Sequence, residues 1–379
     1  MTETAGYGGA ALPPGLRARF VDNGNGLDIH VLEAGFDGGE RPCVVLLHGF
    51  PELAYSWRKV MPALAAAGYY VVAPDQRGYG RTSGWDADYD GDLRPFRLTN
   101  LVRDILGLIA ALGRREVAGV FGHDAGSYVA ACCALIRPDL FHSLAMMSAP
   151  FTGPPPLAPP GSTVDTIHDD LAALSRPRKH YQWYYSTRPA NADMVECPQG
   201  VHAFLRAYFH HKSADWAGNR PHPLTAWSAE ELAKMPTYYI MDLDRTMAET
   251  VAAEMPSAEE IAACAWLTDD ELAVYSAEFA RTGFQGGLQW YRCMTGGGNA
   301  ADLGLFAGRT VDVPACFIAG KSDWGIYQKP GAVDKMQSAA CTDFQDLHVL
   351  DGAGHWVQQE QADEVGRLLI DFLARTRQA

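Results

Sequence analysis

The first 150 residues alternate between short apolar runs and longer stretches whose apolar positions have helical spacing. The runs with the character of strands are Arg17–Val21, Leu27–Leu32, Cys43–Leu47, Tyr69–Ala73, Val117–Phe121 and Ser143–Met147. The helical patterns are Tyr55–Ala66, Leu98–Leu112 and Gly126–Leu135. Alternation of strand and helix at this spacing predicts a mainly parallel sheet that is covered by helices on both faces.

The pattern changes after Pro150. The segment Gly153–Pro160 is rich in proline, which is typical of a linker. Residues 163–294 then show helical patterns with many aromatic residues and no alternation of the kind that predicts strands.

The alternation of strand and helix returns near the C-terminus. The predicted elements there are strands at Ala315–Ala319 and Leu347–Leu350 and helices at Gly331–Met336 and Asp363–Arg375. The sequence therefore predicts an α/β core domain, residues 1–150 and 296–379, which is interrupted by a helical lid domain, residues 151–295.

Length, charge and cysteine usage narrow the class of protein. A chain of 379 residues fits a core with one large insertion, and its net charge of −14 disfavours nucleic acids and anionic membranes as partners. The first residues show no basic region followed by an apolar region, so we expect no secretory signal, and no apolar run is long enough to span a membrane. The eight cysteines lack metal-type spacing and are interpreted as buried residues in a reducing compartment. We therefore expect a cytoplasmic protein without a metal or other cofactor.

A candidate nucleophile lies between a predicted strand and a predicted helix. Gly122, Asp124 and Gly126 have the spacing glycine-x-nucleophile-x-glycine, and a sharp turn of this kind exposes the middle residue above the sheet. Glycines are needed on either side because the turn leaves no space for side chains. A carboxylate is ionised at neutral pH, so Asp124 could attack an sp³ carbon directly and form a covalent ester. The alternative interpretation is a helix-capping aspartate.

The base and the acid that orients it are expected after the last two strands. His355 follows the last predicted strand, and Asp323 follows the strand before it. The order nucleophile, acid, histidine is that of α/β-hydrolases. The loop after the strand at 143–147 contains no carboxylate, which favours Asp323 as the acid. Such a carboxylate fixes the tautomer of the imidazole and stabilises its charged form.

An oxyanion hole would complete this chemistry. The segment Leu46–Pro51 follows a strongly apolar strand and could direct the backbone N–H of Phe50 at a developing oxyanion. The N–H of Ala125 is expected to be the second donor. In the neighbouring loops we expect a structural role for His48 and a structural pairing of Asp75 with Arg77.

Taken together, these motifs resemble those of the soluble epoxide hydrolase group of the α/β-hydrolase superfamily. The shared segments are H-G-F-P at His48, D-x-R-G-x-G-x-S at Asp75, G-H-D at Gly122, G-K-S-D at Gly320 and G-H-W at Gly354. The resemblance implies an α/β-hydrolase fold with a mostly parallel central sheet. It also implies opening of an epoxide to a vicinal diol through an ester on Asp124, which is hydrolysed by water that His355 and Asp323 activate.

Two lid segments extend the resemblance. His180–Tyr185 and Gly283–Arg292 are similar to the segments that carry the two lid tyrosines, which implies Tyr181 and Tyr291 as the phenols that bind the epoxide oxygen. A phenol is protonated at pH 7 and donates more strongly as that oxygen gains charge.

The neighbouring Tyr184 and Tyr185 leave the choice of the first phenol open. We assign Trp183, Tyr185 and Trp324 to substrate binding and expect a small apolar or aromatic substrate.

The sequence departs from the family at two places. Ala125 stands where a tryptophan is frequent, which makes the pocket floor smaller and removes an indole donor. The lid also has extra sequence around Met241–Trp266, which could enlarge the pocket or form an oligomer contact.

Two other functions use the same scaffold. The first is a haloalkane or haloacid dehalogenase, but Ala125 lacks the side chain that would bind a halide. The second is a ligand-binding protein that retains the triad without turnover. The adjacent His210 and His211 would point apart on a helix, so they do not predict a metal site. A homo-oligomer remains open.

Overall fold

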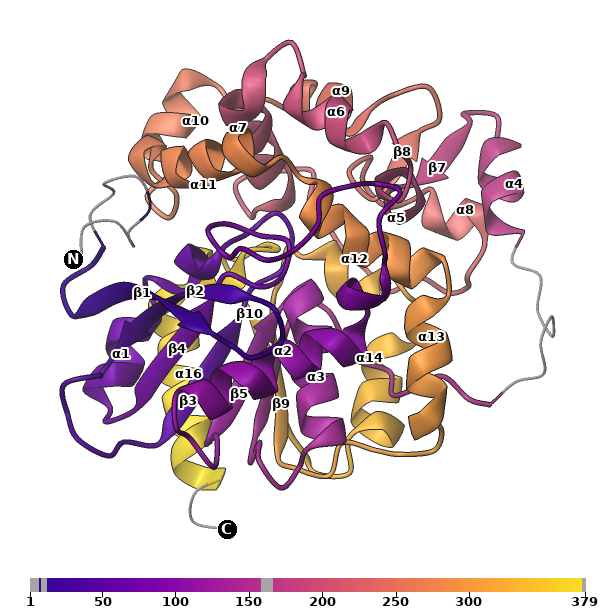
Figure 1. Cartoon of the computed structure of the whole chain (residues 1–379). Helices are drawn as coiled ribbons and strands as arrows, with labels where there is room; N and C mark the ends of the chain where they lie inside the picture. The colour runs from indigo at the N-terminus through magenta and orange to yellow at the C-terminus, as the bar shows by residue number, and fades with distance from the viewer. Residues whose placement is uncertain (1–6, 8–11, 158–165, 377–379) are drawn as a thin grey trace.

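The protein is described here by a computed structural model of Tyr7, residues 12–157 and residues 166–376. Among these residues, eight strands form one sheet in the order β1-β2-β4-β3-β5-β6-β9-β10 (Figure 1). The strands are β1 Leu16–Asp22, β2 Asp28–Ala34, β3 Cys43–Leu47, β4 Tyr70–Pro74, β5 Gly119–His123, β6 Leu144–Met147, β9 Ala315–Gly320 and β10 Phe344–Leu350. β2 pairs antiparallel with β1 and β4, and the other neighbours pair in parallel. This confirms the mainly parallel sheet that the sequence predicts.

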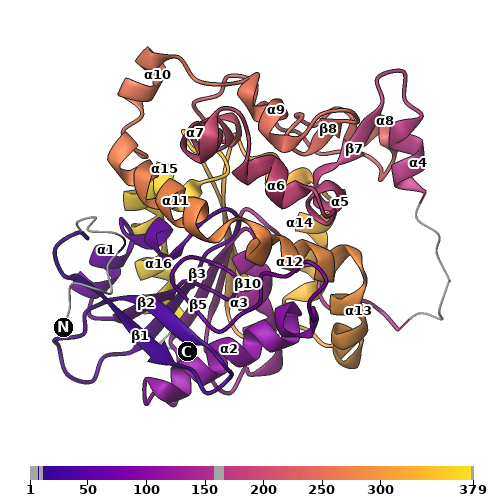
Figure 2. The same cartoon turned by 45° about the horizontal axis from the view of Figure 1, so that its top comes forward.

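Helices cover both faces of the sheet, so β3, β4, β5, β6 and β9 are buried at every residue. α1 packs with α16, and α2 packs with α3, on opposite faces (Figures 1 and 2). The helices of the core are α1 Met61–Ala66, α2 Leu98–Ala111, α3 Ala125–Ile136, α14 Ala332–Lys335, α15 Val357–Glu360 and α16 Ala362–Thr376.

Between β6 and β9 the chain forms a series of helices, most of which lie as a layer above the sheet at the top of Figure 1, whereas the last of them lies lower, beside the core. We call α4 to α13 the lid. These helices are α4 Ile167–Ala172, α5 Tyr181–Tyr185, α6 Ala190–Val195, α7 Gly200–Lys212, α8 Ala229–Leu232, α9 Met247–Ala252, α10 Ala258–Ala263, α11 Asp269–Thr282, α12 Gln285–Thr295 and α13 Gly298–Leu303. α7 packs against both α9 and α11, which makes it the central helix of the layer.

The expectation that this segment lacks strands is wrong. β7, Arg178–His180, pairs antiparallel with β8, Ile240–Asp242. Strands of three residues are too short to produce a recognisable alternation in the sequence, and their partners are far apart in the chain. The small ribbon places Tyr181 at its end, where the Tyr181 N–H donates to the carbonyl oxygen of Tyr239 at 2.9 Å.

The helix predicted at Tyr55–Ala66 is in fact two elements, a 3₁₀ helix at Ala54–Trp57 and α1. Pro62 explains the break, since proline lacks an N–H and is favoured in the first turn of a helix.

The predicted pairing of Asp75 with Arg77 is also wrong. The oxygens of Asp75 accept hydrogen bonds from Tyr7 at 2.6 Å and from Nδ1 of His30 at 2.8 Å, besides two backbone N–H groups. This leaves no lone pair for Arg77, whose guanidinium binds both oxygens of Asp104 at 2.7 and 2.8 Å. His48 has the expected structural role, because its Nε2 accepts the N–H of Gln76 at 3.1 Å.

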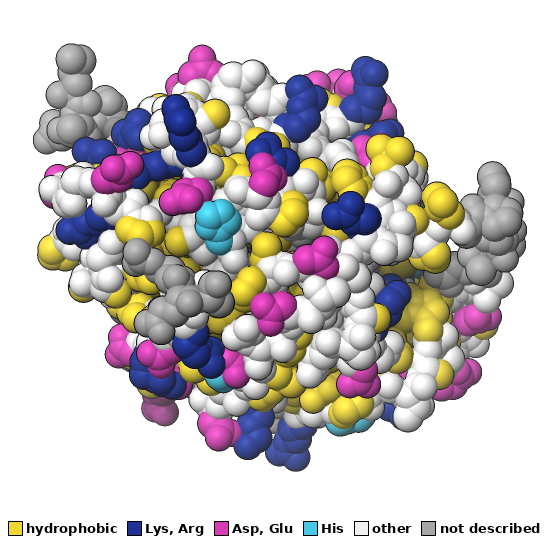
Figure 3. Space-filling model, turned by 90° about the horizontal axis from the view of Figure 1, so that it is seen from below, with side chains coloured by type: hydrophobic (Ala, Val, Ile, Leu, Met, Phe, Trp, Pro, Cys, Tyr) yellow, Lys and Arg dark blue, Asp and Glu magenta, His cyan; other side chains and the backbone are white. Residues whose placement is uncertain are grey.

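No helix in the described ranges has the length and apolar character that a bilayer crossing requires. Figure 3 shows the face opposite the lid, where acidic and basic side chains are interspersed. That face therefore offers no field of a single sign to a charged polymer.

The tightest packing in the core occurs where β5 turns into α3. A Cβ added to Gly126 would collide with the carbonyl oxygens of Leu47, the last residue of β3, and of His48, the residue after it. A Cβ added to Gly122 would collide with the backbone of Gly126 in the same way. The two glycines therefore let α3 start directly against the neighbouring strand.

We expect Gly126→Ala to lower the free energy of unfolding by about 1–3 kcal/mol, because backbone atoms must move to make room. Urea unfolding followed by circular dichroism measures this change. Gly304→Ala is the matched control, since Gly304 has φ −56° and no atom within 4 Å of an added Cβ. Equal stability of the two variants would contradict the close approach.

Candidate active site

Asp124 stands at the top of the turn between β5 and α3. Its backbone has φ 51° and ψ −123°, a strained conformation for a residue other than glycine. The turn raises the carboxylate above the carboxyl end of the sheet, where it lines a cavity under the lid. The Oδ1 atom accepts the backbone N–H of Phe50 at 3.1 Å.

The imidazole of His355 lies between two carboxylates. Its Nε2 is 3.3 Å from Oδ2 of Asp124, and its Nδ1 donates to Oδ1 of Asp323 at 3.2 Å. Both residues follow the ends of neighbouring parallel strands, β10 and β9, so the sheet itself brings them to the nucleophile. Asp323 is fixed in turn by the N–H of Gly325 at 2.6 Å.

The charges in this group keep both carboxylates ionised. Burial alone would raise the pKa of Asp124, but the hydrogen bond and charge of His355 outweigh burial and hold that pKa well below its usual range. Burial opposes ionisation of Asp323 as well, and His355 again lowers its pKa. The direction of this shift favours the ionised form of Asp124.

Two backbone N–H groups, those of Phe50 and Ala125, lie next to the carboxylate of Asp124. The N–H of Phe50 already binds Oδ1, and Ala125 is the first residue of α3, whose N–H has no acceptor within the helix. Gly49 makes this arrangement possible, because a Cβ there would collide with the carboxylate of Asp124. The structure thus brings together the two amides that the sequence predicts for an oxyanion hole.

A second buried pair lies beneath the nucleophile, and the sequence analysis missed it. Nδ1 of His123 donates to Glu52 at 2.6 Å, and its Nε2 donates to the carbonyl oxygen of His355 at 2.7 Å. Because both ring nitrogens face acceptors, His123 is an imidazolium. Burial opposes this charge, and the carboxylate of Glu52 raises the pKa of His123 above its usual value. The sequence did contain a signal for this pair, because His123 directly precedes Asp124 and Glu52 directly follows the H-G-F-P segment.

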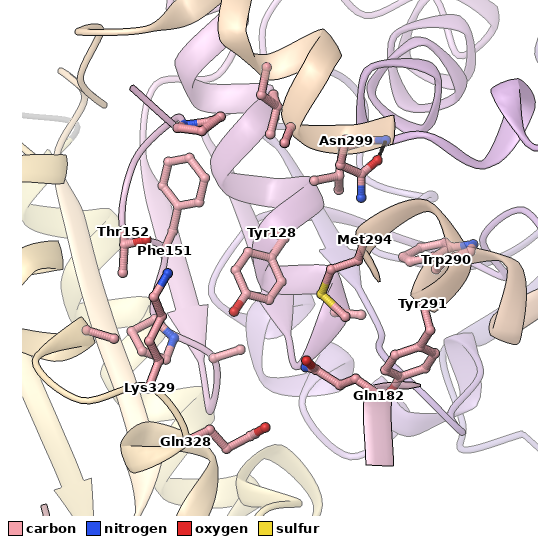
Figure 4. A pocket seen from close by; sticks show the side chains of 18 of the residues that line it. Tyr128, Phe151, Thr152, Gln182, Trp290, Tyr291, Met294, Asn299, Gln328 and Lys329 are labelled. Carbon is pink, nitrogen blue, oxygen red and sulfur yellow. Dashed lines mark hydrogen bonds between the residues drawn. The ribbon is translucent and has the colours of Figure 1, made fainter. Parts of the chain in front are cut away.

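The lid places two phenols in the same cavity as Asp124. Tyr181 on α5 and Tyr291 on α12 are both buried, with ring centres 5.9 Å apart. Burial, together with the charge of Asp124, raises the pKa of each phenol well above 10, so both stay protonated. Figure 4 shows Tyr291 beside Gln182 at the cavity.

The cavity has a volume of about 820 Å³. Its wall between the lid and the core is largely apolar, with Tyr128, Phe151, Trp290 and Met294 among the lining residues (Figure 4). Such a space suits an apolar small molecule with a few polar contacts.

The comparisons with known proteins agree with this geometry. The family model described as alpha/beta hydrolase fold matches residues 42–362. Epoxide hydrolase A of Mycobacterium tuberculosis is 35% identical over 94% of this chain and 96% of its own length. An epoxide hydrolase of Caballeronia sordidicola is 32% identical over 92% of this chain and 91% of its own. This chain belongs to the epoxide hydrolase family of α/β-hydrolases.

Solved structures of epoxide hydrolases are similar along almost the whole chain. An enzyme from an endophytic Streptomyces superposes with a TM-score of 0.77 at 31% identity, covering 97% of this chain and 98% of its own. Epoxide Hydrolase A from Mycobacterium thermoresistibile gives a TM-score of 0.73 at 33% identity, with 95% and 98% covered. The α/β-hydrolase fold expected from the sequence is thereby confirmed.

Of the three side chains that the sequence analysis assigned to substrate binding, one lines the cavity and two do not. Trp183 lines the cavity of this family member. Tyr185 does not, because it is fully buried behind the phenols, packs on Phe50 and Tyr291, and donates to the hydroxyl of Tyr208 at 3.2 Å. Consecutive residues of a helix point about 100° apart, so α5 cannot present all of its aromatic residues to one space.

Trp324 is likewise turned away from the cavity. Its indole is buried against His222, with ring centres 4.9 Å apart. The residue that follows it, Gly325, does line the cavity. Tyr184, the other candidate for the first phenol, donates to Asp193 at 2.8 Å on the far side of α5.

The extra lid sequence around Met241–Trp266 lies away from this space. None of its residues is among the described residues that line the cavity. It packs on the outer side of α7 instead, where Trp216 donates to Glu254 at 3.0 Å. Over the described ranges, no three His, Cys, Asp or Glu side chains are grouped so that they could hold a metal ion.

The lowered pKa of Asp124 has a consequence for stability. An unfolded aspartate titrates near pH 3.9, so the ionised native carboxylate contributes stability that is complete above that pH and is lost as the pH falls toward the folded pKa. We expect the difference in unfolding free energy between the wild type and Asp124→Asn to shrink as the pH falls from about 5 to about 2.

Urea titrations of both proteins at a series of pH values measure this difference. Asparagine suits the comparison because it tolerates a positive φ and has the same shape as aspartate. Parallel stability curves over that range would contradict the ionised, His355-bonded carboxylate.

Proposed function

We propose that this chain hydrolyses an epoxide to a vicinal diol, with Asp124 as nucleophile and His355 with Asp323 as the base. The observation that carries the proposal is the juxtaposition of an ionised carboxylate and two protonated phenols in one apolar cavity. An epoxide needs both: an anion to attack carbon and an acid to receive the departing oxygen.

In the first step Oδ2 of Asp124 attacks an epoxide carbon and the bond from that carbon to oxygen breaks. Oδ1 is held by Phe50, so Oδ2 is the atom available for attack. The developing alkoxide takes a proton from Tyr181 or Tyr291, whose hydrogen bonds strengthen as charge builds on the oxygen. The product of the step is an ester of Asp124 and a hydroxyl group.

In the second step His355 takes a proton from water, and the resulting hydroxide adds to the ester carbon of Asp124. The N–H groups of Phe50 and Ala125 hold the oxyanion. Collapse of this tetrahedral intermediate breaks the bond between the Asp124 carbon and the ester oxygen that is bound to the substrate. That oxygen takes the proton from His355 and becomes the second hydroxyl. The carboxylic acid proton restores the phenol, so one epoxide and one water become one diol.

The surroundings of the site support further parts of the proposal. The apolar lining fits a small apolar or aromatic substrate. All eight cysteines are free thiols, which fits the expected cytoplasmic location. Residues 151–295 as a separate lid domain and a homo-oligomer both remain predictions.

The ester can be tested directly with His355→Gln. Loss of the base should leave ring opening intact and stop hydrolysis, so a substrate-sized mass increase should accumulate on the peptide that contains Asp124, with turnover reduced by at least about 10³-fold. In water enriched in ¹⁸O, a single turnover of the wild type should label Asp124 and not the diol.

Asp124→Ala is the control and should form neither adduct nor diol. A normal rate of diol formation by Asp124→Ala would overturn the mechanism. Halide release from haloalkanes or haloacids, assayed beside diol formation, would favour the dehalogenase alternative.

The phenols can be tested with Tyr181→Phe and Tyr291→Phe. Removing both hydroxyls should slow ester formation by about 10²–10⁴-fold, since general-acid catalysis contributes that much, and each single change should have a smaller effect. Rapid-quench measurement of the Asp124 adduct reports this step.

Tyr184→Phe is the matched control because its hydroxyl binds Asp193 outside the cavity. It should keep the wild-type rate of ester formation within about twofold, far inside the range that general-acid catalysis spans. A loss as large as that of Tyr181→Phe would contradict the assignment of the first phenol.

A further inference from the structure

Lys212, the last residue of α7, is a buried cation next to the site. It is 2% exposed, and its ammonium group has no hydrogen bond or ion pair with any residue in the described ranges. Four aromatic rings surround it instead. The distances from Nζ to the ring centres are 4.8 Å for Tyr239, 5.3 Å for Tyr208, 5.4 Å for Trp356 and 5.8 Å for Tyr238. Burying a lysine in this way is costly, and aromatic faces compensate only in part.

The position of Lys212 is fixed relative to the base. Its carbonyl oxygen accepts the backbone N–H of His355 at 2.9 Å. A Cβ on Gly354 would collide with the backbone of Lys212 and Ser213, so the loop before His355 lies directly on the end of α7. The indole of Trp356 donates to the carbonyl oxygen of Phe209 on the same helix at 2.8 Å. Figure 2 shows α7 above α15, the helix that follows this loop.

Three carboxylates interact electrostatically with the ammonium group of Lys212 but form no hydrogen bond or ion pair with it. They belong to Asp124, Asp323 and Glu52, which lie on three separate segments. Burial lowers the pKa of Lys212 to about 8 while these carboxylates oppose the decrease, so the lysine is mostly charged at neutral pH. Other titratable groups near it are the imidazole of His211 and the phenols of the surrounding tyrosines. Glu360 is close as well, since its carboxylate accepts the N–H groups of Ala214, Gly354 and Trp356.

One oxygen of Asp323 is buried without a hydrogen-bond donor in the described part of the chain. Its Oδ1 binds His355 and Gly325, whereas its buried Oδ2 has no hydrogen-bond donor among the described residues. The charge of Asp323 is the strongest charge acting on Tyr238 and Tyr239, two of the rings around Lys212. The charge of Asp323 therefore acts on two of the rings that also surround the ammonium group.

We propose that Lys212 is a positioning residue whose buried charge keeps His355 unprotonated once Asp124 has become an ester. The inference rests on the proposed function. Ester formation removes the charge of Asp124 and leaves the anion of Asp323 beside the imidazole. That anion favours an imidazolium, which cannot accept a proton from water. The ring centre of the His123 imidazolium is only 5.0 Å from that of His355, but its charge is paired with Glu52. The unpaired cation of Lys212 therefore offsets the anion of Asp323, so the base is ready for hydrolysis.

The test compares Lys212→Met with Lys212→Arg. Methionine keeps the unbranched apolar chain against the rings and removes the charge, whereas arginine keeps the charge. The rate constant for hydrolysis of the Asp124 ester is measured from pH 5 to 9 by rapid quench and peptide mass spectrometry, in single turnovers of the full chain.

We expect the acid limb of this profile to move to higher pH by about one unit in Lys212→Met, so that hydrolysis at pH 6 slows about tenfold and ester accumulates. Ester formation should change less, and Lys212→Arg should follow the wild type. Lys212→Gln is the second neutral variant and replaces methionine in the comparison if thermal unfolding shows that Lys212→Met is not folded.

An unmoved acid limb in a folded neutral variant would overturn the inference and leave the proposed function intact. An equal shift in Lys212→Arg would also overturn it, because the effect would then come from packing. Absence of an Asp124 ester in the wild type would reject the proposed function, and the inference with it.

Discussion

The site depends on one backbone conformation, the positive φ of Asp124 at the end of β5. In this conformation a single carboxylate meets an amide on one side and an imidazole on the other. The glycines at 122 and 126 and the adjacent strand β3 enforce the conformation by leaving no other path for the chain. The core thus stabilises a turn that is strained by itself, and the gain is a nucleophile with a fixed direction of attack.

Around this turn the parallel sheet works as a frame. The ends of β3, β5, β9 and β10 bring the proposed oxyanion donors, nucleophile, acid and base to one edge, while the lid adds the two proposed phenols from above. The division has a physical logic. Groups that must keep sub-ångström geometry through both steps stand on the sheet, and groups that define the substrate space stand on the lid.

The parts that the sequence could predict are those fixed by local backbone rules. Asp124, Asp323 and His355 follow strands with strong apolar patterns, and their order along the chain gives their order in space. Side chains whose neighbours come from tertiary packing were less accessible. Tyr185 and Trp324 have the residue types expected of a binding site, yet each faces a different part of the interior.

Charge partners were the hardest to infer. The sequence suggests Asp75, the nearest acidic residue, as the partner of Arg77, whereas the fold supplies Asp104 from α2. Lys212 directly follows His210 and His211, which do not predict a metal site. Its local sequence also does not indicate the aromatic rings that distant segments place around it, such as those of Tyr239 and Trp356.

The attachment of α7 to the histidine loop has a bearing on how molecules enter. Because the end of that helix and the base share hydrogen bonds, lifting α7 would dismantle the catalytic group along with the roof. The cavity is also bordered by the proline-rich stretch at 154–156, which carries none of the proposed catalytic groups. We therefore expect substrate and diol to pass beside this stretch, while the end of α7 keeps its position over the base.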